Sequence, residues 1–187
     1  MNKLTIGSIL ILALFAISCS SNEAAEDQNG EKLTEETSGK VNIPNSPCDW
    51  IDKVDIRTLI GVDAQYEISM EAKDYTFPAC SFRWEDGKVV KNMEVAGRKM
   101  TVDSPSEVMV VFASDINAEK FERSVQVYKD GENVEGVGEE AMWGAEMSQL
   151  SFRKGTVMMH VHVKVDNDGA VNKKHALKIA EFLIAKM

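Results

Sequence analysis

The sequence lacks an excess of basic residues: 21 Lys and Arg stand against 30 Asp and Glu, a formal net charge of −9 at pH 7. Nucleic-acid-binding proteins carry a basic stripe that neutralises phosphates. Proteins that adhere to anionic membranes by charge carry clusters of Lys and Arg. The acidic balance of this chain therefore argues against nucleic acid as a partner, and against attachment to a membrane by charge.

Catalytic and cofactor-binding motifs are lacking as well. The chain has no Gly-x-Ser-x-Gly, His-Glu-x-x-His or P-loop pattern. The pair Gly136-x-Gly138 lacks the third glycine of a dinucleotide-binding loop, and Asp166-Asn167-Asp168-Gly169 lacks the spacing and closing Glu of a calcium loop. Both segments are interpreted as turns. We therefore expect a protein that is not an enzyme and that holds no cofactor.

The longest apolar run is short and lies at the N-terminus. It covers residues 4–17 and ends at Ala16-Ile17-Ser18-Cys19. A run of about fourteen residues is too short to cross a hydrocarbon core of roughly 30 Å, but it has the length and flanks of a signal peptide. Small residues that end on a cysteine resemble the lipobox of bacterial lipoproteins, although Ala16 stands where Leu is commoner. The resemblance implies a lipoprotein signal peptide over residues 1–18 and an acylated, typically palmitoylated, Cys19. An ordinary secretory signal with a chance cysteine is the alternative.

Residues 19–44 are expected to form an acylated, flexible and acidic linker. They are rich in Glu, Ser, Thr, Gly and Asn and nearly free of large apolar side chains, so burial cannot repay the entropy of ordering them. The linker would tether a domain of residues 45–187 to the cell envelope, and the expected location is the outer membrane. The acidic residues that closely follow Cys19 resemble export signals of surface-displayed lipoproteins, so both the periplasmic face and the cell surface remain open.

Cysteine is scarce, with three residues in the chain. Once Cys19 is assigned to lipid, Cys48 and Cys80 remain as an even pair in an oxidising compartment, where disulfides persist. The two are too far apart for a CxxC metal motif, and no nearby Cys or His spacing completes a zinc site. The pair therefore predicts one disulfide.

Hydrophobic periodicity predicts three helical regions. The first begins at Ser46-Pro47 and ends at Gly61, with Asp55 as a candidate cap for a second short helix. Ser114, Asp115 and Asn117 cluster as start residues of another helix, with Ala118, Phe121 and Val125 on its buried face. The last helix has Asn172 as its cap and an apolar face that reaches Met187.

Between these regions, apolar and polar residues alternate with the period of strands, most strongly over residues 156–165. Glu85-Asp86-Gly87-Lys88 predicts a hairpin turn, and Gly97-Arg98 predicts another. Both halves of the domain show the same order of elements and contain Ser-Phe-Arg, at residues 81–83 and 151–153. We expect an α+β fold with one mainly antiparallel sheet of about six strands, three helices packed on one face, and pseudo-duplicated α-βββ halves.

Four pieces of the domain resemble a group of small uncharacterised bacterial lipoproteins. They are the helix that starts at Cys48, the segment Cys80-Ser81-Phe82, the segment Gly136-Val137-Gly138-Glu139-Glu140-Ala141-Met142-Trp143, and the C-terminal helix. The resemblance implies an extracytoplasmic, PsbP-like α+β domain and carries no catalytic residue over to this chain.

One cluster has metal-ligand chemistry. On the predicted strand 156–165, alternation places Met158, His160, His162 and Lys164 on the face opposite the valines. Two imidazoles and a thioether on one strand face would suit copper or haem. The alternative is that both histidines are ordinary residues of a polar sheet face and bind no metal. His175, in the opening turn of the last helix, is expected to be exposed.

Two functions are therefore predicted. The first is a lipid-anchored envelope protein that acts as a non-enzymatic binding module for an envelope protein, a peptidoglycan-associated assembly or a small apolar ligand. The second is a metal- or haem-binding lipoprotein that uses Met158, His160 and His162.

Overall fold

A computed structural model of the chain describes residues 43–187. The predicted signal peptide, Cys19 and nearly all of the predicted linker lie outside the described residues. Within the described part, no helix combines the length and hydropathy needed to cross a membrane.

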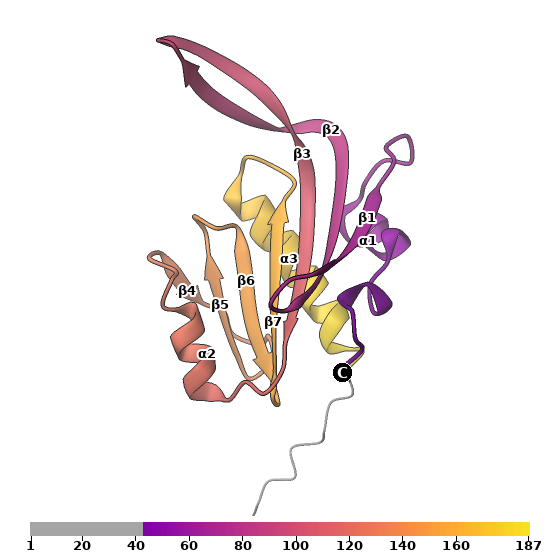
Figure 1. The fold of residues 1–187 in the computed structure, drawn as a ribbon, viewed down its shortest axis with the longest axis vertical. Coiled ribbons are helices and arrows are strands. Elements are labelled where there is room, and N and C mark those ends of the chain that lie inside the picture. Colours follow the sequence, from indigo (N-terminus) through magenta and orange to yellow (C-terminus); the bar gives the residue numbers. More distant parts are fainter. Residues whose placement is uncertain (1–42) are drawn as a thin grey trace, which may run out of the picture. The chain divides into compact units, whose positions relative to one another are not determined.

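Seven antiparallel strands form one sheet in the order β1-β2-β3-β7-β6-β5-β4 (Figure 1). This confirms the predicted α+β class, with one strand more than expected. The additional strand is the short β4, whose residues are all exposed and show no alternation. The strands are β1 (Ser69–Asp74), β2 (Pro78–Val95), β3 (Arg98–Ala113), β4 (Gly131–Asn133), β5 (Glu140–Gly144), β6 (Gln149–Lys154) and β7 (Val157–Lys164).

Each helix begins at a side chain that caps its free N–H groups. The elements are a 3-10 helix η1 (Pro47–Asp49) and the α-helices α1 (Lys53–Ile60), α2 (Ala118–Val125) and α3 (Gly169–Ile184). Asn117, one of the three clustered start residues, caps α2. α1 is capped by Asp52 rather than Asp55, because Asp55 occupies the third helical position and completes a capping box with Asp52.

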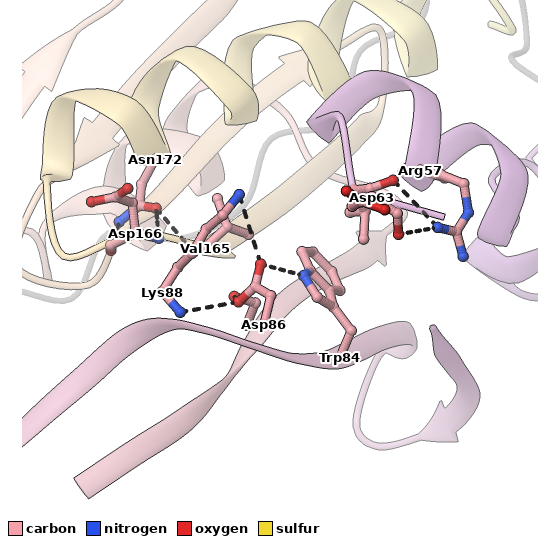
Figure 2. A network of polar contacts seen from close by, with 10 residues as sticks. Arg57, Asp63, Trp84, Asp86, Lys88, Val165, Asp166 and Asn172 are labelled. Carbon is pink, nitrogen blue, oxygen red and sulfur yellow. Dashed lines mark hydrogen bonds and ion pairs between the residues drawn. The ribbon is translucent and has the colours of Figure 1, made fainter. Parts of the chain in front are cut away.

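The N-terminus of α3 also differs from its prediction. Asp168 caps the helix, and Asn172 lies within the first turn, fully buried. The Asn172 amide accepts hydrogen bonds from the Val165 and Asp166 N–H groups at 3.0 and 3.1 Å, and donates one to the Asp166 carbonyl at 2.9 Å (Figure 2). Asn172 therefore fixes the chain reversal between β7 and α3 from inside the helix.

The two faces of the sheet are covered unequally. One face carries the main core, in which Phe82, Phe152 and Val161 are 0% exposed and cluster with residues of η1, α1 and α3. On the opposite face, α2 buries Met158. The remainder of this second face, which we call the open face, carries half-buried polar residues such as Lys164.

The position of α2 corrects the prediction that the helices share one face. Phe121 and Val125 of α2 pack against Ala113 and Met158, the apolar residues at that end of the second face. The strands do match between the halves, because Ser-Phe-Arg lies in β2 and in β6, and β3 and β7 pair at the centre. The predicted duplication therefore describes the sheet, but not the helices.

The predicted disulfide joins Cys48 at η1 to Cys80 in β2, with 5.2 Å between the Cα atoms. Cys80 is fully buried. The bond therefore holds the first helical segment against the core face of the sheet.

β2 and β3 continue past the sheet as a two-stranded ribbon (Figure 1). We call this ribbon, residues 89–104, the arm. The chain reverses at Ala96-Gly97, where φ is +50° and +77°, as in the mirror-image turns that suit hairpins. The predicted turn at Gly97-Arg98 is therefore confirmed to within one residue.

The hairpin turn predicted at 85–88 was wrong, because the chain passes through it with a shift of register between Trp84 and Val89. The Asp86 carboxylate accepts a hydrogen bond from Trp84 Nε1 at 2.8 Å (Figure 2). It accepts another from Ser106 Oγ at 2.7 Å. Residues 85–88, whose sequence is typical of turns, therefore form an irregularity within a long strand. The arm leaves the sheet at this point.

Candidate functional site

The histidines lie on the predicted side of β7. Val161 and Val163 point into the core and are 0% exposed, whereas His160 and His162 are half-buried on the open face. His160 is paired across the sheet with Val111 and Ser151, and His162 with Met109 and Gln149. Met158 shares their face of the strand, but it is 3% exposed in the cluster beneath α2.

His160 is the end of a series of buried and partly buried hydrogen bonds. Gln149 Nε2 donates to Tyr128 Oη at 2.6 Å, Tyr128 Oη lies 2.5 Å from Ser151 Oγ, and Ser151 Oγ lies 2.6 Å from His160 Nδ1. Gln149 Nε2 also lies 3.2 Å from His160 Nδ1. Because that nitrogen is a donor, Nδ1 is assigned as the acceptor and the neutral ring carries its proton on Nε2. The series then runs in one direction from Gln149 to His160.

Burial lowers the pKa of His160 to about 4, because the charged ring would lose its hydration. Burial likewise raises the pKa of Tyr128, although its hydrogen bonds to Ser151 and Gln149 partly oppose that change. At neutral pH both side chains are therefore uncharged, and the series of hydrogen bonds is a partly buried polar network.

The Ser151–His160 pair has the distance of a nucleophile and its base. Ser151 is 0% exposed, however, beneath the side chains that surround it. A hydroxyl with no solvent contact cannot meet a substrate without rearrangement of the sheet face. The pair therefore holds Tyr128 and His160 in place, and its geometry gives no support to hydrolysis.

The metal alternative finds few free ligand atoms. His160 Nδ1 accepts from Ser151 and Gln149 and its proton is on Nε2, so His160 offers no free lone pair. His162 Nδ1, in contrast, donates to the Met147 carbonyl at 2.9 Å and leaves Nε2 as a single free ligand atom of the pair. Among residues 43–187, no group of three His, Cys, Asp or Glu side chains is arranged to hold a metal ion. The copper or haem site stays a prediction, without a specific observation in its favour.

His175 differs from its prediction, because it is half-buried rather than exposed. α1 packs against α3 and brings the Leu59 backbone beside the ring. α3 packs on the core face of β7, so the sheet lies between His175 and the two histidines of the open face. It therefore adds nothing to a ligand set on the open face.

The segment that contains Gly136-x-Gly138 packs closely against Arg153 and binds its guanidinium. Glu139 contacts Arg153 Nη1 and Glu140 contacts Arg153 Nε, both at 2.6 Å. Gly138 has φ of +62°, and a side chain there would press against the Arg153 carbonyl oxygen. The glycine is therefore required for close backbone approach, and the two acidic residues neutralise a guanidinium whose side chain is 13% exposed.

Two hollows differ in charge. One, of about 500 Å³, lies between α2 and residues 133–142, and its charged lining residues are Glu122, Glu135, Glu139 and Glu140. Two of these carboxylates are already occupied by Arg153. The side chains around this hollow therefore form an acidic surface. The Arg153 guanidinium of the same chain already neutralises part of its charge.

The second hollow, which we call the basic groove, has a volume of about 370 Å³ and lies where the open face meets the arm. Its titratable lining residues are Arg83, Lys91, Glu107, His162 and Lys164. Arg83 Nε donates to Glu107 Oε2, and this hydrogen bond raises the pKa of Arg83, so the guanidinium stays charged. No ion pair among the described residues involves Lys91 or Lys164.

Sequence reasoning missed this groove. Its residues come from three strands, and Arg83 and Lys91 belong to one strand on either side of a register shift. The available signal was Lys164, which shares a strand face with His162. A lysine beside a histidine disfavours a metal, but it favours an anion.

No protein-family model, curated protein or solved structure matches this chain.

Proposed function

We propose that this chain is a lipid-anchored, non-enzymatic binding module of a bacterial cell envelope, held by Cys19. The arm and the adjoining open face would be its binding surface. The observation that supports this most is the exposure of the arm: Met93 is 47%, Val95 51%, Met100 50% and Val102 39% exposed. A two-stranded ribbon is marginally stable by itself, and gathered exposed apolar side chains are typical of contact surfaces.

The position of the tether supports the same proposal. The first described residues lie beside the C-terminus, at the end of the domain opposite the arm (Figure 1). A linker attached there would present the arm away from the anchor. Its expected span, roughly 25–30 Å for about 25 residues, would let the domain search the space beside the membrane.

Acylation is tested by growing cells that express the full chain with an alkyne-labelled fatty acid. We expect the label on wild-type protein, in a peptide that begins at Cys19, and none on Cys19→Ala. The Cys48→Ala/Cys80→Ala variant should keep the label, because it retains Cys19. Unlabelled wild-type protein, or label retained by Cys19→Ala, would contradict the proposed anchor.

Binding through the arm is tested by photo-cross-linking in living cells. A photoreactive p-benzoylphenylalanine at Met93 or Met100 should give a discrete adduct. The same group at Val54 or Val127, which are 70% and 63% exposed outside the binding surface, should give none. Equal adducts at all four positions, or none at any, would contradict the proposed binding surface.

A further inference from the structure

We propose that the basic groove and the arm together bind an anionic amphiphile, with its oxyanion headgroup in the groove and its apolar chain along the arm. This inference rests on the proposed function and specifies its ligand. It concerns a single amphiphile molecule rather than a bilayer surface, since the chain carries a net charge of −9 and an anionic bilayer would repel most of it.

The headgroup assignment rests on charge. Three basic side chains, Arg83, Lys91 and Lys164, line the groove together with the single carboxylate Glu107. Glu107 neutralises Arg83, which leaves the two lysine charges uncompensated by any ion pair of the described residues. In an acidic protein this is a local concentration of positive charge, and it complements a phosphate or carboxylate group.

The size of the groove limits what enters it. A volume of about 370 Å³ lies at the small end of the range for ligand pockets, so it suits a polar headgroup and not a complete lipid. The apolar part of an amphiphile must then lie outside the groove, on a surface that adjoins it.

The arm supplies that adjoining surface. Lys91 lines the groove, and alternation along β2 places Met93 and Val95 on the same face of the ribbon as Lys91. The register pairs Lys91 with Val102 and Met93 with Met100, so four apolar side chains share this face. All four are at least 39% exposed.

The two faces of the arm also differ in the charged side chains that they carry. The face that carries Lys91 also carries Arg98, paired with Val95, and no carboxylate. Both acidic residues of the arm, Glu94 and Asp103, alternate onto the other face. The surface that continues the groove is therefore apolar with cations at its two ends, which fits an anionic amphiphile and disfavours a cationic one.

The test uses the full chain in a non-ionic maltoside detergent and isothermal titration calorimetry. The probes are dihexanoyl phosphatidylglycerol, dihexanoyl phosphatidylcholine and inorganic phosphate. We expect phosphatidylglycerol to bind at least tenfold more tightly than either other probe, because it alone combines an anionic group with apolar chains. Its affinity should fall as salt is added. Equal binding of phosphatidylcholine would show that the site does not distinguish an anionic headgroup from a zwitterionic one. Equal binding of phosphate would show that the arm does not contribute. Either result, or no binding of phosphatidylglycerol, overturns the inference.

Variants then locate the site. Lys91→Gln/Lys164→Gln should weaken phosphatidylglycerol binding about tenfold or more, as expected for lost charge-assisted contacts. The matched control Lys174→Gln/Lys178→Gln removes the same charge from exposed positions on α3 and should leave binding within about twofold. Met93→Ser/Met100→Ser should weaken phosphatidylglycerol binding, but not phosphate binding. Equal losses in the groove and control variants would overturn the inference.

The outcomes separate this inference from the proposed function. Arm adducts to a protein without any phospholipid binding would leave the binding module in place and remove the amphiphile. Loss of the Cys19 acyl label would remove the lipid anchor, whereas the wild-type titration would still decide the ligand of the groove.

Discussion

Replacing Cys48 and Cys80 together by alanine is expected to lower the free energy of unfolding by roughly 3–4 kcal/mol. The disulfide closes a loop between residues 32 positions apart, and its removal restores the conformational freedom of that loop in the unfolded chain. The contacts of η1 with β1, β2 and β3 remain in the variant, so the expected loss is that of the loop closure.

Urea unfolding followed by tryptophan fluorescence measures this loss. Wild-type protein treated with dithiothreitol should show a decrease similar to that of Cys48→Ala/Cys80→Ala, and the double variant should not respond to the reductant. Cys19 is unchanged in the variant, so the anchor does not contribute to the difference. A double variant as stable as the oxidised wild type would show that the bond does not stabilise the domain.

The sequence predicted well those features that depend on local alternation and on a single pair of cysteines. Val161 and Val163 point into the core and His160 and His162 do not, as the period of two requires. The disulfide followed from the count of cysteines and the expected compartment. Both predictions needed only one element or one pair of residues.

The features that were missed depend on contacts between distant elements. Asp86-Gly87 has turn chemistry, but the Trp84 indole and the Ser106 hydroxyl bind the Asp86 carboxylate and make the site an irregularity within a strand. Ser106 lies 20 residues away, beyond the reach of local patterns. The amphipathic pattern of α2 likewise shows that one helix side is buried, but not which sheet face buries it.

The parts of the candidate site that the sequence did not predict also depend on contacts between distant elements. Alternation placed Met158 with the histidines, yet α2 covers Met158 and does not cover the histidines. The basic groove joins Lys91 of β2 to Lys164 of β7 across β3. Strand order determines that proximity, and strand order was not available from the sequence.

Acidification from pH 7 to pH 4 is expected to destabilise the domain through His160 by an amount on the order of 3 kcal/mol. The folded-state pKa of His160 is about 4, and that of an unfolded histidine is about 6.5. Between these values the unfolded chain binds more protons than the folded one. The stabilisation is therefore complete above about pH 6.5, and it is lost as pH falls toward 4.

Protonation also disturbs the series of hydrogen bonds that ends at His160, which adds a structural reason for the loss. A charged ring carries a proton on Nδ1, and that nitrogen would then face the Gln149 Nε2 donor at 3.2 Å. Ser151 would have to accept from His160, which reverses the order of donors back to Tyr128. Unfolding removes both this conflict and the desolvation of the charged ring.

His160→Gln isolates the contribution of this residue. Its amide oxygen can accept from Ser151 but does not titrate, so the variant should lose less stability than wild type between pH 7 and pH 4. Other groups still titrate in both proteins. His175, whose pKa is lowered by burial and then by the charge of Lys178, acts in the same direction. The difference between the two unfolding curves therefore reports His160 alone. Parallel curves, or an NMR titration of the His160 ring with a midpoint near pH 6.5, would contradict the buried neutral imidazole on which this prediction rests.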